Sequence, residues 1–308
     1  EVEDVVFYNV SMFGSAKPVI AFNNGTQYGE IFIAYRKSTS EGLRQKSKYR
    51  NPGTGGNWLW SSETLISDTD QNSLNQSVCS RSGEVHIAFE KLNSIYYLKG
   101  YTQSSNWLFT NFANISALGG FSTNKYPSIS ISNNLSPYVL VSWQGGYENN
   151  AEKSLPKETG TPIYRYNTVT KVRNLVTGIW GTFNNFGSEV NYSNNNSLNT
   201  TSGTVISWSE NNGATSKFVK RNPSGTYGSI QSLSNGIQPM ISNGTNLQNV
   251  KAMVFNNLVP APYVIERCGN DFSQETLSKG NALLSDSISF GRSGVIAKNE
   301  IEFVFNIG

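Results

Sequence analysis

Two glutamates stand where a pair of catalytic carboxylates could act. Glu90 directly follows a short apolar stretch that alternates like a β-strand, and Glu210 follows another such stretch after one serine. Hydrolysis of a glycosidic bond uses two carboxyl groups about 5–5.5 Å apart in retaining enzymes and about 6.5–9.5 Å apart in inverting ones. Because the two glutamates belong to repeats that are not neighbours in the chain, we expect a larger separation. We interpret them as solvated acids and assign no catalytic residue.

The single histidine, His86, is the other candidate for acid–base chemistry. It lies inside an apolar stretch, between Val85 and Ile87, and therefore on the opposite strand face from both. We expect a packed, hydrogen-bonded side chain rather than a catalytic one. With one histidine and two cysteines, the sequence excludes multi-histidine and cysteine-based metal centres.

Residues 68–72, with the sequence Asp-Thr-Asp-Gln-Asn, begin like a calcium-binding loop. Such a loop needs a glycine at its sixth position and a bidentate acid at its twelfth. Ser73 and Cys79 occupy those positions here, so we interpret the segment as a surface turn. We expect no metal and no cofactor.

The composition excludes several classes of protein. Of the 308 residues, 37% are hydrophobic, 12% aromatic and only 15% charged, which is typical of neither a disordered chain nor a coiled coil. The net charge of +3 is too small for a dedicated nucleic-acid binder, and no apolar run reaches the ~18–20 residues of a membrane span. The chain begins at Glu1 without an apolar leader, so we expect a processed product or a domain of a longer parent chain.

One short pattern recurs six times along the chain and must position these side chains. It consists of a turn, an alternating β-branched and apolar stretch, an aromatic residue and then a polar residue. Residues 29–36 and 83–90 are clear copies. The aromatic anchors are spaced by 54, 54, 65, 47 and 50 residues and are Tyr35, Phe89, Trp143, Trp208, Phe255 and Phe305.

Each copy also has neighbouring strands. A shorter strand precedes it, joined by a tight polar turn such as residues 80–83 or 291–294, which predicts a hairpin. A third strand follows each of the first five copies, and then a weaker fourth strand. Four short antiparallel strands at a period near 50 predict the blade of a β-propeller. A β-sandwich would not produce six near-equal copies of one hairpin.

We therefore predict an all-β fold, a six-bladed β-propeller of four-stranded antiparallel blades forming a single domain over residues 1–308. The sixth blade lacks its outer strands, and we expect residues 1–12 to complete it and close the ring. Cys79 and Cys268 then fall in opposite blades and remain free thiols. The expected blades cover about 17–67, 75–116, 125–190, 196–234, 238–285 and 286–308.

The blade pattern resembles the sialidase-like (BNR, or Asp-box) β-propeller superfamily. Residues 83–89, 95–97 and Trp107 carry the resemblance best, and residues 126–143 carry it next; the Asp-box turn itself is degenerate, since residues 51–58 lack its aspartate. Active members of that family use three arginines, a tyrosine nucleophile and an acid/base aspartate. Arg36 alone reaches the expected face, whereas Arg81 and Arg292 lie in hairpin turns at the opposite end, so we do not expect sialidase activity.

In a propeller the ends of the second strands and the loops after them share one face, here called the top face. Residues 144–160 form an insertion after the third such strand. A mixture of amides, aromatics and a few charges suits sugar hydroxyls or a protein partner. The expected ligand-binding residues of the top-face rim are Arg36, Lys37, Glu90, Lys91, Gln144, Tyr147, Glu148, Glu210, Asn211 and Asn256.

These observations favour a non-catalytic binding module that recognises a glycan or a protein partner. We expect it to be secreted or on a cell surface, in a bacterium, without contact to nucleic acid or insertion into a membrane. Two alternatives remain open. One is a carbohydrate-active enzyme, either a sialidase-like glycoside hydrolase or a polysaccharide lyase. The other is a structural subunit or spacer of a surface assembly.

Overall fold

The computed structural model places the backbone of most of the chain, in strands and short turns. Side chains are described in most of these ranges up to residue 232. The described residues are 18–23, 30–37, 40–50, 57–103, 106–132, 136–148, 164–190, 196–200, 203–210, 215–234, 237–243, 250–256, 263–268, 274–278, 288–297 and 300–307.

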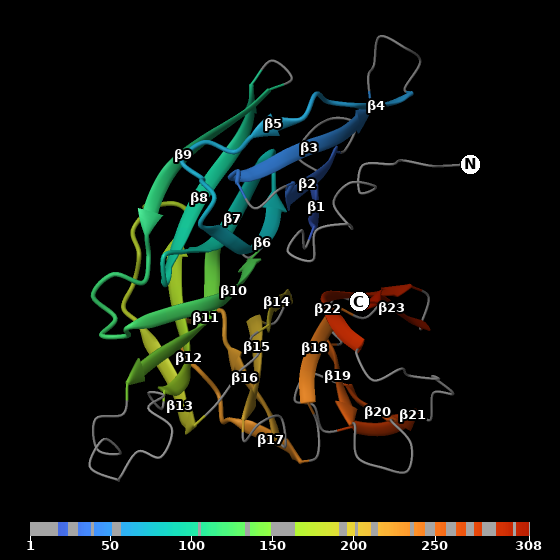
Figure 1. Cartoon of the computed structure of the whole chain (residues 1–308). Coiled ribbons are helices and arrows are strands. Elements are labelled where there is room, and N and C mark those ends of the chain that lie inside the picture. Colours follow the sequence, from blue (N-terminus) through green and yellow to red (C-terminus); the bar gives the residue numbers. More distant parts are fainter. Residues whose placement is uncertain are drawn as a thin grey trace. The chain divides into compact units, whose positions relative to one another are not determined.

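Every regular element among the described residues is a β-strand (Figure 1). The chain divides into two compact units. The first unit comprises residues 1–119 and 124–131, and the second comprises 120–123 and 132–308. None of the described elements is a helix that could cross a membrane.

Two sheets make up most of the first unit. The first sheet has the order β1-β2-β3-β4, with β5 also paired to β3, so its outer strand is split in two. Its strands are β1 (Val19–Asn23), β2 (Glu30–Arg36), β3 (Leu43–Arg50), β4 (Trp58–Trp60) and β5 (Thr64–Leu65). The second sheet, β6-β7-β8-β9, contains β6 (Ser73–Arg81), β7 (Glu84–Lys91), β8 (Ser94–Gln103) and β9 (Asn106–Asn114).

The remaining sheets repeat the same sequential strand order. The third sheet contains β10 (Thr123–Ile131), most of which belongs to the first unit, with β11 (Tyr138–Glu148), β12 (Tyr164–Asn174) and β13 (Asn184–Val190). The fourth contains β14 (Asn196–Thr200), β15 (Gly203–Glu210), β16 (Thr215–Arg221) and β17 (Gln231–Ser234).

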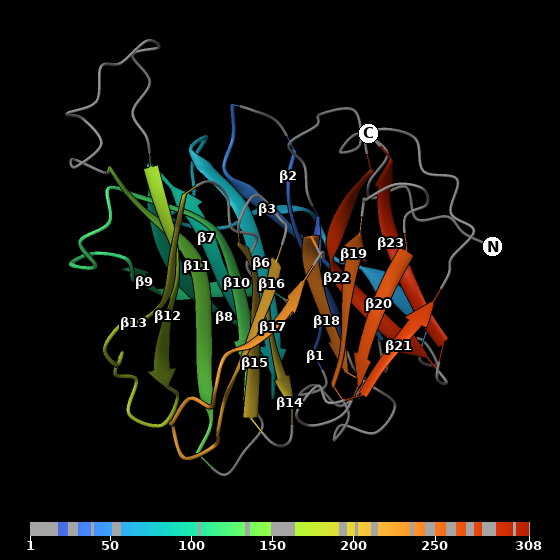
Figure 2. The same ribbon diagram turned by 90° about the horizontal axis from the view of Figure 1, so that it is seen from below.

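Two further sheets follow. The fifth contains β18 (Ile237–Asn243), β19 (Val250–Asn256), β20 (Tyr263–Cys268) and β21 (Gln274–Ser278), which run side by side in Figure 2. The last is a hairpin of β22 (Ile288–Ala297) and β23 (Glu300–Ile307).

The predicted four-stranded antiparallel sheets are therefore confirmed. The number of blades and the closure of a ring stay predictions, as does the single domain. The expected closing strand, residues 1–12, lies outside the described residues.

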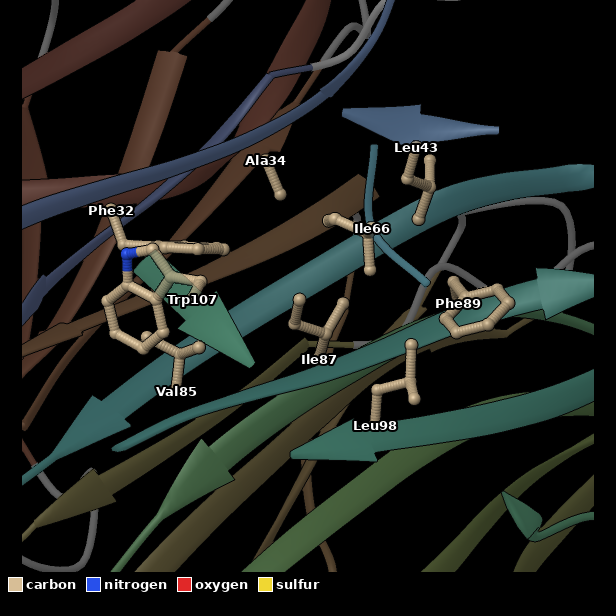
Figure 3. Close-up of a cluster of buried hydrophobic side chains, with 9 residues drawn as sticks. All are labelled: Phe32, Ala34, Leu43, Ile66, Val85, Ile87, Phe89, Leu98 and Trp107. Carbon is tan, nitrogen blue, oxygen red and sulfur yellow. The ribbon is translucent and has the colours of Figure 1, made fainter. Parts of the chain in front are cut away.

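The second strand of each sheet is buried on both faces where its side chains are described. In the first unit, Phe32 and Ala34 of β2 pack against Val85, Ile87 and Phe89 of β7 (Figure 3). Each such side chain contributes roughly 1.5–3 kcal/mol when it is fully buried. The aromatic anchors with described side chains are at most 1% exposed, as core positions should be, and are Tyr35, Phe89, Trp143 and Trp208.

Trp107 joins the two sheets of the first unit. It comes from the outer strand β9, and its ring meets Phe32 edge-on with a centroid distance of 4.9 Å. Its indole N–H donates to Ser47 Oγ at 2.7 Å and to Glu30 Oε1 at 3.1 Å. Trp107 thus links the first sheet to the second.

One predicted turn is confirmed and another is wrong. Ser82 and Gly83 have positive φ values of 50° and 87° and form the two-residue turn between Arg81 and Glu84. Residues 291–294 form no hairpin turn; they lie within β22, where the pairing shifts register between Phe290 and Gly294. The hairpin reverses between Ala297 and Glu300 instead. A glycine-rich stretch inside a strand suits such a bulge as well as it suits a turn.

Candidate functional site

An open hollow of about 470 Å³ lies in the first unit, at the end where β2 and β7 finish. It is formed by the link from β2 to β3 and by the link from β5 to β6. Its lining combines carboxylates, a guanidinium, amides and one exposed leucine: Ser40, Glu41, Gly42, Arg44, Leu65, Asp70, Gln71 and Asn72.

A close backbone contact holds the two links together. The main-chain N–H of Leu43 donates to Thr69 Oγ1 at 3.0 Å, and that hydroxyl donates to the carbonyl of Ile66 at 2.7 Å. A side chain at Gly42 would meet Thr69, because a Cβ there would lie 2.5 Å from Oγ1 and 2.6 Å from the carbonyl oxygen. The glycine is therefore required for the links to pack at this distance.

Arg44 stands between two carboxylates. Its Nε and Nη2 donate to Glu41 Oε2 at 2.9 and 2.7 Å, and its Nη1 lies 3.3 Å from Glu63 Oε1. Lys37 Nζ donates to the same Glu63 oxygen at 3.1 Å, and the Tyr35 hydroxyl donates to the other one. Burial alone would raise the pKa of Glu63, but these hydrogen bonds and the charges of Lys37 and Arg44 outweigh it and lower that pKa.

The turn at residues 68–72 is held from both sides. From β2, Arg36 Nη2 donates to the carbonyl of Gln71 at 2.6 Å. From β7, Lys91 Nζ lies 2.9 Å from Asp70 Oδ2 and also reaches the carbonyl of Asp68 at 3.4 Å. The Asn72 N–H donates to Asp70 Oδ1 at 2.8 Å. Burial opposes the ionisation of Asp70, but the hydrogen bonds from Lys91 and Asn72 prevail and lower its pKa.

Glu90 lies beside this site but is only 7% exposed. Asn75 Nδ2 donates to its Oε2 at 2.8 Å. Asn75 has a φ of 49° and sits where the pairing of β6 with β7 shifts register, which directs its amide toward the glutamate. The expectation of a solvated rim acid is therefore wrong for Glu90.

The predicted rim residues of the first unit lie at the same strand ends as the hollow, but none of them lines it. Arg36 is 7% exposed and, with Lys91, positions the turn; Lys37 contacts Glu63. The lining side chains with the most exposed charge, Glu41 and Asp70, were missing from the predicted rim. Asp70 stood in a segment that the sequence singled out as a turn, whereas nothing in the sequence distinguished Glu41.

In the second unit, Gln144 is 2% exposed in the middle of β11, so it is not a rim residue. The strand runs on to Glu148, and residues 144–148 are strand rather than the start of a loop. The two glycines there serve close packing: a Cβ at Gly145 would lie 2.8 Å from Phe121, and one at Gly146 2.5 Å from Tyr166.

The other predicted residues of the second unit cannot be joined to the hollow. The backbones of Tyr147, Glu148, Glu210 and Asn256 belong to strands, but their side chains lie outside the described residues. Asn211 lies outside the described residues altogether. The separation of Glu90 from Glu210 therefore stays a prediction.

Two of the described groups that could act in catalysis, His86 and Tyr35, are engaged in the core. His86 is fully buried, and its Nδ1 lies 2.7 Å from the hydroxyl of Tyr97, as expected for a packed histidine. Burial and the hydrogen bond to Glu63 raise the pKa of Tyr35 and keep its phenol protonated. Among the described side chains, no group of three or more histidine, cysteine, aspartate or glutamate residues could hold a metal ion.

No protein-family model and no curated protein sequence matches this chain. Its fold matches solved β-propeller structures. The fucose-specific lectin from Aleuria aurantia has a TM-score of 0.50 at 11% identity, over 87% of this chain and 80% of the lectin. The Trypanosoma rangeli sialidase gives 0.48 at 10% identity, over 93% of this chain and 51% of the sialidase. The NanB sialidase from Streptococcus pneumoniae gives 0.45 at 6% identity, over 94% and 80%.

At such low identity the match shows the fold alone. The described strands form antiparallel sheets, four of them four-stranded, and their fold matches that of the fucose-specific lectin.

Proposed function

We propose that this chain is a non-catalytic glycan-binding module, secreted or displayed on a cell surface, and that it binds its ligand in the hollow of the first unit. The hollow carries the proposal because it places two partly exposed carboxylates beside an apolar wall. The side chains of Glu41 and Asp70 are 39% and 45% exposed, and Leu65 is 49% exposed.

This combination suits a sugar. Sugar hydroxyls donate hydrogen bonds, and those accepted by a carboxylate are about twice as strong as bonds between neutral groups. The C–H faces of a sugar ring pack against apolar side chains such as Leu65. The volume of about 470 Å³ falls within the range of roughly 300–1,000 Å³ of small-molecule sites.

Six copies of one strand pattern support a six-bladed propeller, with residues 1–12 completing the last blade. In such a ring, the hollow would lie on the top face between the first and second blades. The low charge content, together with the many Asn, Ser, Thr and Tyr residues, motivates the proposed location outside the cell.

The side chains around the hollow favour binding over catalysis. Tyr35 is 1% exposed and donates its proton to Glu63, so it is not poised as a nucleophile. Glu90 is turned to Asn75 rather than to the hollow.

A glycan array read both for retained protein and for released product tests the proposal. We expect retention without release. Leu65→Lys should abolish retention because its ammonium would enter the hollow. Leu108→Lys, a 40% exposed leucine on the outer strand β9, is the matched control and should bind like the wild type. Release of product, or equal retention by both variants, would refute the proposal.

A further inference from the structure

We infer that the hollow selects uncharged sugars and rejects acidic ones; this inference rests on the proposed glycan binding at the same site. The evidence is that the cationic side chains around the hollow are already bound to other groups of the protein. Acidic sugars such as uronic acids carry a carboxylate, which needs N–H donors that the protein can spare. The question is therefore which donors point into the hollow without a partner of their own.

Arg44 is the single guanidinium among the residues that line the hollow, and each of its three nitrogens already faces a glutamate. Two of them, Nε and Nη2, bind Glu41, and the third, Nη1, faces Glu63. To bind the guanidinium in the same way as Glu41, an incoming carboxylate would have to displace one of these two glutamates. Displacement would leave a like charge beside the ligand, so the guanidinium offers an acidic sugar little gain.

The other cations near the hollow are engaged as well. Lys37 is bound to Glu63, and Lys91 to Asp70. Arg36 as a whole is 7% exposed, and its Nη2 donates to the carbonyl of Gln71. The side chains of Lys37 and Lys91 are 45% and 18% exposed, but each is held in an ion pair.

The exposed carboxylates of the hollow are paired in turn. The side chains of Glu41 and Asp70 are partly exposed but bind Arg44 and Lys91, and Leu65 supplies the apolar wall. An acidic sugar would therefore meet two carboxylates whose cations are already bound. One unpaired carboxylate about 4 Å away would cost a ligand carboxylate a factor of roughly 5 in affinity in water, and the paired cations reduce this cost. A neutral sugar avoids the repulsion, since its hydroxyls can donate to the carboxylate oxygens.

Pairs of ligands that differ only in charge provide the test. Methyl galactoside is compared with methyl galacturonide, and methyl glucoside with methyl glucuronide, by saturation-transfer NMR and calorimetry on the whole chain at pH 7. We expect the neutral member to bind several-fold more tightly in each pair that binds. Raising the salt concentration should narrow this preference, because it arises from charge repulsion.

Two variants and a control assign the preference to the carboxylates. Glu41→Gln and Asp70→Asn should each weaken binding of the neutral sugar and reduce the discrimination several-fold. Asp68→Asn removes a carboxylate two residues away that does not line the hollow, at a φ of 62° that asparagine tolerates. It should behave like the wild type.

The outcomes separate the inference from the function on which it rests. If an acidic sugar binds as tightly as its neutral partner and Leu65→Lys abolishes both, the proposed function stands and the inference is overturned. If the preference is unchanged in both Glu41→Gln and Asp70→Asn, the role of the carboxylates is refuted. If no neutral or acidic glycan binds on the array or in solution, both proposals fail together.

Discussion

Replacing Gly42 with alanine should disturb the hollow without touching a charged group. A Cβ at this position would lie 2.5 Å from Thr69 Oγ1, 2.6 Å from its carbonyl oxygen and 2.7 Å from its carbonyl carbon. The hydroxyl could rotate, but the carbonyl belongs to the backbone and cannot. The turn at residues 68–72 must therefore shift away from β3.

The expected cost follows from these contacts. Overpacking of this kind costs about 1–3 kcal/mol. The shift also weakens the hydrogen bond from the Leu43 N–H to Thr69 Oγ1, now 3.0 Å, and each hydrogen bond contributes about 0.5–1.5 kcal/mol net. We expect Gly42→Ala to destabilise the first unit by about 2–4 kcal/mol. It should also weaken sugar binding by more than tenfold, since Asp70 moves with the turn.

Urea unfolding followed by tryptophan fluorescence measures the change, because Trp107 lies in the core of the first unit. Gly181→Ala is the matched control: its nearest neighbour would be the carbonyl oxygen of Val172 at 3.5 Å, an ordinary contact, so its stability should change by less than about 1 kcal/mol. Equal urea midpoints for the two variants, or unchanged sugar affinity in Gly42→Ala, would show that the contact does not constrain the turn.

Three further perturbations test other parts of the structure. The pKa of Glu63 is lowered in the folded state, so its contribution to stability is present above pH ~4.5 and is lost as the pH falls through the folded value. Glu63→Gln should therefore show a shallower loss of urea midpoint between pH 5 and 3 than the wild type, and parallel curves would contradict this. Burial raises the pKa of the Cys79 thiol, so in a Cys268→Ser background a thiol reagent at pH 8 should label the native protein at least tenfold more slowly than the unfolded one; equal rates would show that the thiol is accessible. Trp107→Phe removes the donor to Ser47 and should cost about 1–3 kcal/mol in urea unfolding, whereas an unchanged midpoint would show that the hydrogen bond is dispensable.

The sheets could be predicted because their signal is local and repeated. A run such as residues 85–89, fully buried in the structure, reads in the sequence as a short apolar stretch between turn residues. The aromatic anchor at its end marks the period. The glycines were harder to interpret: residues 291–294 and 144–148 look like turn or loop sequences, yet both lie within strands. The strands continue there because the β22–β23 hairpin accommodates a register shift between Phe290 and Gly294, and because Gly146 packs against the ring of Tyr166. Glycine suits these arrangements as well as it suits a turn.

The hollow could not be predicted because it depends on contacts between distant segments. Sequence placed Arg36 and Lys91 at the correct end of their strands, but not the acceptors that they meet. The carbonyl of Gln71 lies 35 residues from Arg36, and the Asp70 carboxylate 21 residues from Lys91. Only the path of the link between two sheets brings them together. A cationic side chain at the end of a strand therefore did not indicate a cation that is available to bind a ligand.

The same contacts connect the fold to the proposed selectivity. The first two sheets pack through an apolar core that Trp107 completes, and the link between them must turn sharply at their common end. Such a turn leaves polar backbone groups and a carboxylate that need partners. Arg36 and Lys91 supply them, so the cations that could have bound an acidic ligand are used in holding the turn. A variant in which the ion pair between Lys91 and Asp70 is broken should therefore lose both the order of the turn and the discrimination against acidic sugars. Selectivity that persisted with a disordered turn would show that the two are independent.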